Sequence, residues 1–578
     1  MVLNRLSYRN VVFYNIVVAL SAILLSAWFD HDVGVVINFY VTLTLYFGEG
    51  LLLASPLWLL PGRWRIIVPV AVWLSTLFLW VNVLYCRYWG DLLPWSLIIE
   101  PASYNVFVFD AIPGLLKWSD IIYVVLPLFI TWLYRRWRIS GAPMPSWQKR
   151  VMFVAIAVVA YCLGICASVT ASYRYYLHSG NPTSLGKVLK EKVSTLSNGR
   201  LFEWQGRGLL LYTYIQLARD KGAIDNLSDN QRNQIENYLG EIDNYHTADS
   251  AFMHNRNKNL ILLVIESLNS WAIGEKINHH SLTPVLDSLL RAEGTVACLD
   301  VVPQRRHGGS SDGHFMYNTG LLPISYGSAA MLFADNDYSG QTLTRHFASS
   351  VDFIVENGSV WNHRATTKAY GYDRLVEQIN VDATPIDSTL FAVAADTIQN
   401  LARPFMAEII SLGMHFPFVD KNLASPGWLE NAAVSDTHLH NYYKAVYGFD
   451  AALGEFLVKI KSEDLYGNSV IVLVSDHDLD VGSRKSDGRI AFIALNTGLT
   501  RHIARTVGQI DVYPAIVEIM GFDGWHGLGL SLLDGRNSSA VLYDGTLIGT
   551  SGSEIDSLKH RAWPVSDLIV RSDYFRKK

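Results

Sequence analysis

The chain has 578 residues, half of them hydrophobic, and a mean hydropathy of +0.18. That balance is too apolar for a purely soluble protein and too polar for a transporter, and the length predicts roughly two to four domain-sized pieces. A net charge of -5 gives no indication of a nucleic-acid partner, and four cysteines, three of them in apolar segments, do not make a disulfide framework.

Residues 1–172 contain five apolar segments, at about 10–28, 36–60, 66–86, 120–134 and 151–170. Four of them are long enough to span a bilayer, and the segment 120–134 is short. Asp30 and Asp32 follow the first segment, whereas Arg63, Arg65 and a five-cation loop follow the second and fourth. By the positive-inside rule this pattern predicts five transmembrane helices, a cytoplasmic N-terminus and an extracytoplasmic remainder. Core helices of a large soluble enzyme are the alternative.

Residues 173–257 are expected to form a helical linker. Aromatic and basic side chains alternate in its first half, which is typical of segments that lie partly in the membrane interface. Ser228 or Asp229 is expected to cap a polar helix that continues to about Gly240. An ordinary soluble helical subdomain is the alternative for this later half.

Residues 258–540 alternate strand-like and helical stretches. The strands expected are 259–265, 295–302, 351–355, 406–412, 469–475 and 490–495, and apolar residues recur at helical spacing in Leu282 to Leu290 and Tyr442 to Ile460. Such alternation predicts an α/β domain with a mostly parallel central sheet. Residues 541–578 are rich in turns and are expected to form a capping segment or a small hairpin.

Two of these strands lead directly into residue types that commonly bind metals. Asn259 to Ile265 leads into Glu266, and Ser469 to Ser475 leads into Asp476 and His477. Ligands of open α/β sheets bind at the carboxyl ends of the strands. Carboxylate and imidazole groups suit a divalent ion, and the imidazole favours Zn²⁺ or Mn²⁺. Each fragment alone is commonly structural, but together they predict one metal site.

A glycine-containing loop is expected to supply the fourth metal ligand, Ser310. Gly308 and Gly309 precede Ser310 and Ser311, and a helix is expected to begin there, so the loop backbone can approach an anion closely. A metal-bound hydroxyl has a depressed pKa and becomes a nucleophile near neutral pH. Ser310 is the expected nucleophile, with Ser311 as the neighbouring alternative.

Other side chains could contact a substrate. His415 follows an apolar strand and could contact a phosphate or protonate a leaving alkoxide, unless it is an ordinary core histidine. The loop that contains Glu356, Trp361, His363 and Arg364 mixes an acid, an aromatic ring and cations, which can hold a phosphodiester or a polyol, although a surface loop could have the same composition. His307 and His314 flank the serine loop and are expected to be supporting or structural residues.

These residues together resemble the lipoteichoic acid synthase family, the phosphoglycerol transferase branch of the alkaline phosphatase and sulfatase superfamily. The resemblance covers the five spans, the linker and the domain from about 258 to 535. Its matching pieces are Ile265 to Ser267, Ser310 to Phe315, Trp361-Asn362, His415 to Phe418, Tyr443 to Phe456, Ser475 to His477, and Gln509 to Asp511 with Pro514.

The resemblance implies metal ligation by Glu266, Ser310, Asp476 and His477, and substrate binding by His415, Trp361 and Glu356. The chain also departs from the family pattern. Ser310 stands where threonine is usual, His314 where an acid is usual, His363 at the place of an arginine with Arg364 one step later, and Asp478 where glycine is usual. The substitution at His363 bears on the choice of headgroup.

The implied reaction moves a phosphoglycerol headgroup from a membrane phospholipid to an envelope glycan or lipid, through a phosphoserine-type intermediate on Ser310. One divalent ion is implied, Mn²⁺ by expectation, with Zn²⁺ and Mg²⁺ as alternatives. The protein would be a multi-pass protein of the bacterial cell (inner) membrane, and its oligomeric state is not readable from the sequence.

Three other functions stay open. Phosphoethanolamine transfer would use the same site with a different headgroup. A sulfatase or phosphodiesterase hydrolase is disfavoured because the serines lack the C/S-x-P-x-R context of sulfatases. A non-catalytic membrane sensor would be expected to have lost a metal ligand, and all four positions keep competent residues.

Overall fold

The structure is a computed structural model. It describes residues 2–34, 38–89, 92–93, 112–178, 184–186, 188–189, 204, 206–218, 223–246, 250–306, 308–325, 327–358, 362–380, 384–418, 420, 422–423 and 425–576. The chain divides into two compact units, residues 1–98 with 112–220 and residues 221–578.

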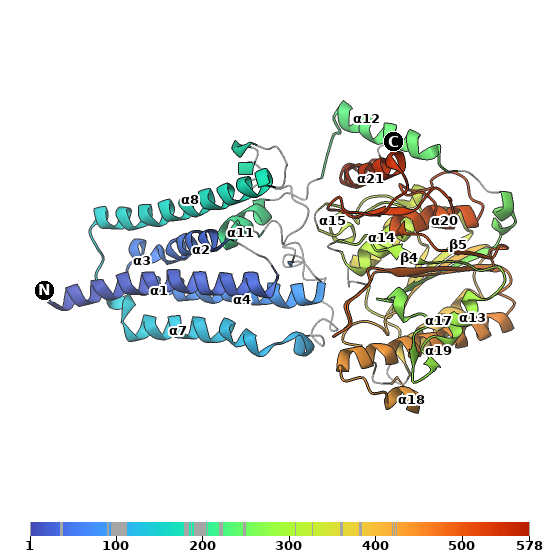
Figure 1. The fold of residues 1–578 in the computed structure, drawn as a ribbon, viewed down its shortest axis with the longest axis horizontal. Helices are drawn as coiled ribbons and strands as arrows, with labels where there is room; N and C mark the ends of the chain where they lie inside the picture. Colours follow the sequence, from blue (N-terminus) through green and yellow to red (C-terminus); the bar gives the residue numbers. More distant parts are fainter. Residues whose placement is uncertain are drawn as a thin grey trace. The chain divides into compact units, whose positions relative to one another are not determined.

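The first unit contains three helices that are long and apolar enough to cross a membrane, among the residues described: Tyr8–Asp32, Gly62–Arg87 and Trp147–Arg174. They correspond to α1 (Val2–Asp32), to η1 (Gly62–Ile66) with α4 (Ile67–Trp89), and to α8 (Trp147–His178). Figure 1 shows α1 and α4 lying side by side. The first, third and fifth expected spans are therefore candidate membrane helices.

The second and fourth expected spans form shorter helices. α2 (Phe39–Ala54) has 16 residues and is followed by α3 (Pro56–Leu59), while α7 (Ile122–Arg136) has 15 residues. At 1.5 Å per residue, α2 is about 24 Å long, less than the hydrocarbon core of about 30 Å. The structure thus supports three candidate membrane helices, and the count of five stays a prediction.

Close helix packing explains how α2 is held in the first unit. A Cβ atom at Gly48 would lie 2.6 Å from the backbone of Tyr161 on α8, and one at Gly164 would lie 2.5 Å from Cα of Leu45 on α2. Small residues permit such approach of two backbones, as in membrane helix pairs. α11 (Gly208–Ala218) also belongs to this unit and contacts α2.

Ionic groups mark the two ends of α4. Arg65 is fully buried and donates hydrogen bonds to the carbonyl oxygens of Leu57, Ile139 and Ala142, at 3.0, 3.0 and 2.7 Å. The positive-inside argument counted Arg65 as a loop charge, but its guanidinium is bound to protein carbonyls. At the other end, Arg87 pairs with Asp120 at 2.7 Å and with Asp32 at 3.5 Å.

The second unit is built on a nine-stranded sheet in the order β10-β4-β9-β8-β1-β7-β5-β6, with β11 paired to β4. All pairs are parallel except those of β9, which runs antiparallel to β4 and β8. The strands are β1 (Asn259–Ile265), β4 (Val296–Val302), β5 (Ser349–Phe353), β6 (Arg374–Val376), β7 (Phe405–Ile410), β8 (Ser469–Ser475), β9 (Ile490–Leu495), β10 (Arg501–Ile503) and β11 (Val507–Gly508). The expected mostly parallel sheet and its six expected strands are confirmed.

Helices cover both faces of the sheet, which makes the central strands apolar on both sides. Alternate residues of β1 join opposite cores: Leu260, Leu262 and Val264 lie in one, and Ile261 and Leu263 in the other. Figure 1 shows α13, α17 and α19 on one face and α14, α20 and α21 on the other. Their bounds are Pro284–Leu290, Ile386–Ile398, Thr437–Ser462, Ser310–Thr319, Val512–Ile519 and Ser553–Ser572.

Smaller elements complete this unit. They are the hairpin β2–β3 (Lys276–Ile277, His280–Ser281), α15 (Ala329–Leu332), α16 (His363–Ala369), α18 (Gly427–Glu430) and the hairpin β12–β13 (Ser539–Val541, Leu547–Gly549). The hairpin expected near the C-terminus is present, but the 20-residue helix α21 that follows it was not predicted.

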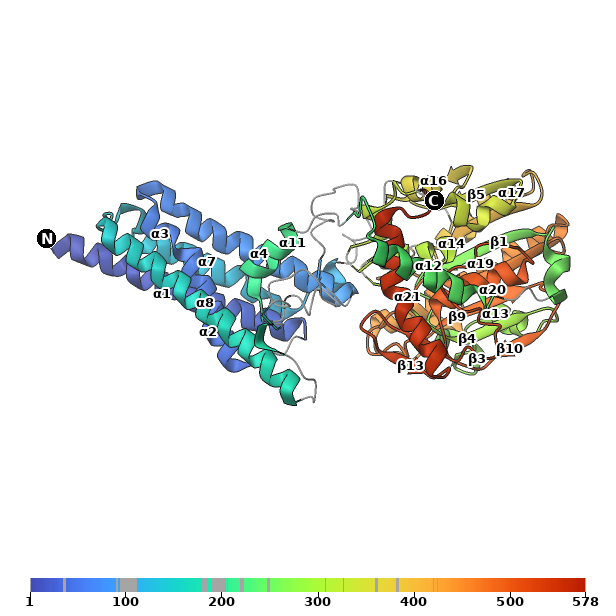
Figure 2. The ribbon, with the colours of Figure 1, turned by 90° about the horizontal axis from the view of Figure 1, so that it is seen from above.

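The later half of the linker belongs to the second unit. α12 (Asp229–Asp243) begins at the predicted cap Ser228, whose side chain accepts from the N–H of Gln231. It packs beside α21 (Figure 2), and Arg561 of α21 pairs with Glu241 at 2.6 Å.

Candidate metal centre and nucleophile

Two neighbouring parallel strands bring the expected metal ligands together. β1 and β8 run in register from Asn259 opposite Ser469 to Ile265 opposite Ser475, so Glu266 and Asp476 leave the sheet side by side. Ligand atoms of Glu266, Asp476 and His477 all lie within 4.8 Å of one another. The three residues are only 7, 1 and 2% exposed. Such convergence at one strand edge is the arrangement that the sequence predicted.

The two carboxylates are held in a way that suits a cation. Asp476 Oδ1 accepts hydrogen bonds from the N–H groups of Ser267 and His477, at 2.8 and 2.7 Å. Its Oδ2 is buried and has no hydrogen-bond partner among the described residues. Burial, and then the charge of Asp476, raises the pKa of Glu266. A divalent ion would satisfy the orphaned oxygen and offset the repulsion, so these residues fit a metal.

The tautomer of His477 is fixed by its surroundings. Nδ1 lies 2.9 Å from the carbonyl oxygen of Asp478, and because a carbonyl only accepts, Nδ1 carries the proton. Nε2 then presents its lone pair to the carboxylates, 3.8 Å from Glu266 Oε1 and 3.7 Å from Asp476 Oδ2. Burial lowers the pKa of His477. A neutral imidazole oriented by a carbonyl is the form that binds metal ions.

Ser310 lies at this cluster and Ser311 does not. Ser310 is the first residue of α14, and its Oγ is 3.2 Å from both Glu266 Oε2 and His477 Nε2. The hydroxyl of Ser311 donates to the carbonyl of Gly308 at 2.8 Å and contacts Ser328 Oγ at 3.0 Å. The register of the loop therefore points Ser310 at the candidate metal position.

The loop that leads into Ser310 is fixed from both sides. Asp312 Oδ2 accepts from the N–H groups of Arg306 and Gly308, at 2.7 and 2.9 Å. On the far side, a Cβ at Gly313 would lie 2.6 Å from the carbonyl oxygen of Asp476, so only glycine lets α14 press against the metal-ligand segment. Gly309, just before Ser310, has φ +55°, which glycine adopts without strain.

His415 lies at the end of β7, near the cluster. Its Nδ1 is 2.8 Å from the carbonyl oxygen of Phe416, so Nδ1 donates and Nε2 is the acceptor nitrogen. Burial lowers the pKa of His415 to about 4. His415 is therefore neutral at physiological pH.

Glu356 and His363 form a second polar group near α14. His363 Nε2 lies 2.8 Å from Asp352 Oδ2, and Asp352 stands opposite Glu408 on the neighbouring strand. Burial opposes the charged imidazole, but the charges of Asp352, Glu408 and Glu356 outweigh it and raise the pKa of His363. Burial raises the pKa of Glu356 to about 7.

The other expected substrate residues are placed differently. Arg364 forms a two-pronged ion pair with Glu377, at 2.8 and 2.7 Å, and its side chain is about half exposed. Trp361 and His307 lie outside the described residues. His314, expected to be supporting, has its ring centroid 6.1 Å from that of His363, and burial lowers its pKa to about 4.

Two residues at the site carried no predicted role. Arg305 follows β4, and its Nη2 donates to the carbonyl of Asp478 at 3.5 Å, next to His477. Gln509 donates from Nε2 to the carbonyl of Asp476 at 2.7 Å. Two consecutive arginines before a glycine pair could have indicated the first residue, and the Gln-Ile-Asp motif had been noted without a role.

The chain is similar in sequence to several known proteins. A sequence model of the sulfatase family matches residues 258–522. The lipoteichoic acid synthase-like protein YvgJ of Bacillus subtilis is 27% identical over 54% of this chain, a match that spans 57% of YvgJ. Lipoteichoic acid synthase 1 of the same organism is 22% identical over 85% of this chain and 79% of its own length.

Among solved structures, the lipoteichoic acid synthase LtaP of Listeria monocytogenes superposes with a TM-score of 0.47 at 21% identity, covering 57% of this chain and 98% of that one. Residues 258–522 thus match the sulfatase family, and most of the chain is distantly similar to the lipoteichoic acid synthases.

Proposed function

We propose that the protein is a membrane-anchored, metal-dependent transferase that moves a phosphoglycerol headgroup from a phospholipid to an acceptor hydroxyl, with Ser310 as the nucleophile. The observation that carries this proposal is the position of Ser310 Oγ, 3.2 Å from both Glu266 and His477 within a buried cluster of metal-binding groups. Homology to lipoteichoic acid synthases over most of the chain supports the reaction class.

Ser310 is well placed to react with a phosphodiester. It opens α14, a helix of 10 residues, so the positive end of the helix dipole favours an anion beside its hydroxyl. Asp312 holds the loop before it, which reduces the motion that would separate nucleophile and phosphorus.

Glu266, Asp476, His477 and Ser310 would hold the metal ion. When bound, a divalent ion such as Mn²⁺, with Zn²⁺ and Mg²⁺ as alternatives, would lower the pKa of the serine hydroxyl and stabilise charge on the phosphoryl oxygens. The chain's own part is to keep His477 in the tautomer that carries its lone pair on Nε2, and to aim Asp476 Oδ2 into the cluster.

The transfer takes two displacements. Ser310 gives up its proton, its Oγ forms a bond to phosphorus, the bond from phosphorus to the diacylglycerol oxygen breaks, and that oxygen takes up one proton, so this displacement releases no net proton. The acceptor hydroxyl then gives up its proton, its oxygen forms a bond to phosphorus, and the bond from phosphorus to Ser310 Oγ breaks, after which Oγ takes a proton back. His415, neutral and with Nε2 as an acceptor, is the group we assign to receive the acceptor's proton.

The headgroup would lie against Glu356 and His363, with Trp361 and Arg364 as further candidates from the sequence. An ammonium headgroup is best neutralised by an ionised carboxylate, but burial raises the pKa of Glu356 to about 7, and Asp352 is already paired with His363. These groups suit a neutral, hydroxyl-bearing headgroup, so phosphoglycerol is favoured over phosphoethanolamine, which is the second candidate.

The membrane unit would bring enzyme and lipid together. Three candidate membrane helices anchor the chain, and attachment raises the effective concentration of a lipid donor. We propose the full arrangement of five spans in the bacterial cell membrane, with a cytoplasmic N-terminus and residues after about 172 outside, where the acceptor would be an envelope glycan or lipid.

The test uses the full-length chain in detergent micelles with Mn²⁺ and either phosphatidylglycerol or phosphatidylethanolamine. We expect release of diacylglycerol from phosphatidylglycerol, lost on chelation and in Ser310→Ala. Release from phosphatidylethanolamine alone would select the second candidate, and release in neither case, with every metal tried, would contradict transfer altogether.

A further inference from the structure

One fully buried amide connects three parts of the candidate site. Gln509 Nε2 donates to the carbonyl oxygen of Asp476 at 2.7 Å and to the hydroxyl of Tyr317 at 2.9 Å. Its Oε1 accepts from the N–H of Gln304 at 2.9 Å. The amide of Gln509 thus uses its donors and its acceptor on three different segments.

Those three segments carry the nucleophile and a metal ligand. Gln304 begins the loop that leads from β4 to Ser310, and its Oε1 accepts in return from the N–H of Ile510 at 2.9 Å. Tyr317 lies on α14, and its hydroxyl donates to the carbonyl of Ser475, the last residue of β8, at 2.5 Å. Gln509 therefore holds the serine loop and helix at a fixed distance from the backbone of Asp476.

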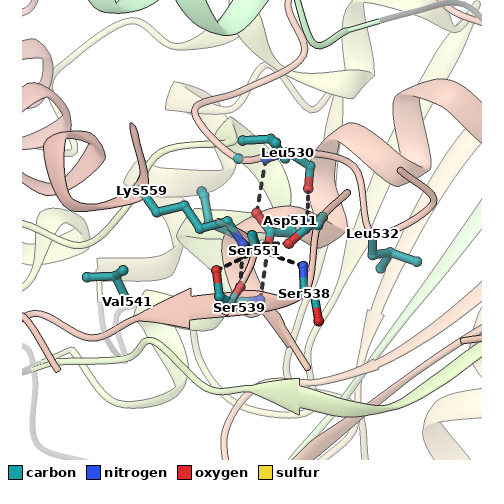
Figure 3. A network of polar contacts seen from close by, with 12 residues as sticks. Asp511, Leu530, Leu532, Ser538, Ser539, Val541, Ser551 and Lys559 are labelled. Carbon is teal, nitrogen blue, oxygen red and sulfur yellow. Dashed lines mark hydrogen bonds and ion pairs between the residues drawn. The ribbon is translucent and has the colours of Figure 1, made fainter. Parts of the chain in front are cut away.

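The turn that contains Gln509 is itself held by the C-terminal helix. Asp511 is fully buried, and Lys559 of α21 donates to its Oδ2 at 3.0 Å, as Figure 3 shows. The same carboxylate accepts from the N–H groups of Gly508 at 2.8 Å and Leu530 at 3.0 Å.

Lys559 is almost fully buried, with 7% of its surface exposed. Its ammonium group also donates to the carbonyl of Ser539 (Figure 3), and to Asn537 Oδ1 at 2.6 Å. Three donors with three acceptors satisfy a lysine fully. A buried ion pair adds little net stability compared with an apolar pair, but it fixes geometry because its partners tolerate few alternatives.

We propose that Gln509 is a positioning residue that sets the distance between Ser310 and the metal ligand Asp476, and that the Lys559–Asp511 pair of the C-terminal helix keeps it in place. This gives residues 541–578 a role at the metal centre. The inference rests on the metal-dependent part of the proposed function and not on the identity of the lipid.

The expected effect is on metal affinity and on turnover. Loss of groups that orient metal ligands typically costs about 10- to 100-fold in metal affinity or activity. The lipid headgroup would contact Glu356 and His363, neither of which touches Gln509, so KM for the lipid is expected to stay near the wild-type value while kcat falls.

The experiment measures Mn²⁺ affinity of the full-length chain by calorimetry and by the electron paramagnetic resonance signal of free Mn²⁺. Gln509→Met keeps the volume of the side chain but removes its hydrogen bonds. The matched control is Asn255→Leu, because Asn255 is also fully buried and donates to two carbonyls, those of Thr497 and Ile519, at 2.8 and 2.9 Å. Thermal melting shows how far each variant is destabilised.

We expect Gln509→Met to weaken Mn²⁺ binding about 10- to 100-fold, and Asn255→Leu to lower the melting temperature without that loss. Equal metal affinity in the two variants, or a wild-type chain that binds no divalent ion, would overturn the proposal. If the variants change Mn²⁺ affinity as expected but the wild-type chain transfers no lipid headgroup, the proposed function is refuted and this inference still holds.

A second pair of variants covers the case in which Gln509→Met does not fold. Lys559→Met leaves the Asp511 carboxylate buried without its cation and is expected to weaken Mn²⁺ binding. Lys559→Met with Asp511→Asn removes the charge as well and is expected to recover part of the affinity. If Lys559→Met binds Mn²⁺ as tightly as wild type, the C-terminal helix does not help to position Gln509.

Discussion

The hydroxyl oxygen of Ser310 lies 3.2 Å from Nε2 of His477, although the two residues are 167 positions apart in the chain. One is the first residue of α14 and the other follows β8, so the contact depends on a helix and a strand meeting at one edge of the sheet. The contact brings the hydroxyl that we propose as the nucleophile to within hydrogen-bond distance of a candidate metal ligand.

Replacing each of the two neighbouring serines in turn should show which one is the nucleophile. Ser310→Ala removes the oxygen at the cluster and is expected to lower kcat by about 10³-fold or more, as nucleophile deletions do. Ser311→Ala loses only hydrogen bonds to Gly308 and Ser328 and should keep most activity. Diacylglycerol release measures both, and equal activity of the two variants would contradict the assignment.

Metal binding should stabilise the folded chain. A ligand present at 100 times its Kd raises the free energy of unfolding by about 2.7 kcal/mol. We expect the melting temperature to rise with added Mn²⁺ and the rise to vanish in Asp476→Asn, because Asp476 Oδ2 is the orphaned oxygen of the cluster. Differential scanning calorimetry measures this, and a Mn²⁺-dependent rise that persists in Asp476→Asn would place the ion elsewhere.

The Asp352–His363 pair should give headgroup binding a pH dependence. The pKa of His363 is raised, so its imidazolium form is present below that pKa and is lost as the pH rises through it. KM for the lipid donor is therefore expected to increase on the alkaline side. Asp352→Asn removes the main stabilising charge and should move this increase to lower pH. A KM profile that is the same in wild type and Asp352→Asn would contradict the role of the pair.

The buried Arg65 should contribute strongly to the stability of the first unit, which contains the candidate membrane helices. Arg65→Met leaves the carbonyls of Leu57, Ile139 and Ala142 without their donor, and each unsatisfied buried group costs about 1–3 kcal/mol. We expect a large loss of thermal stability in detergent. Arg63→Met, an exposed neighbour in the same turn, is the control and should melt like wild type. Equal melting of the two variants would show that Arg65 makes no net contribution.

Much of the site was readable from the sequence because each part has a local signal. Glu266 and Asp476-His477 follow apolar runs that are typical of buried strands, and parallel strands bring their carboxyl ends to one edge. Ser310 follows two glycines at a helix start. The same local signals predicted the six strands, which the structure has within about two residues.

What the sequence did not show depends on contacts without a local pattern. Lys559 and Asp511 are 48 residues apart, and α21 was not expected because glycine-rich turns precede it and Pro564 lies inside it. The second expected membrane span differs from the structure for another reason. Apolar residues run from 36 to 60, but helix α2 ends at Ala54 and a separate short helix, α3, begins at Pro56. Hydropathy alone therefore overstates the length of this helix.

A covalent intermediate on Ser310 is tested most directly by the intact mass of the full-length chain after incubation with phosphatidylglycerol and Mn²⁺ in the absence of an acceptor, followed by peptide mapping. We expect a glycerophosphate-sized adduct on Ser310 that needs the metal and is absent in Ser310→Ala. An adduct on another residue, or release of diacylglycerol with no covalent adduct at any time point, would contradict a covalent intermediate on Ser310.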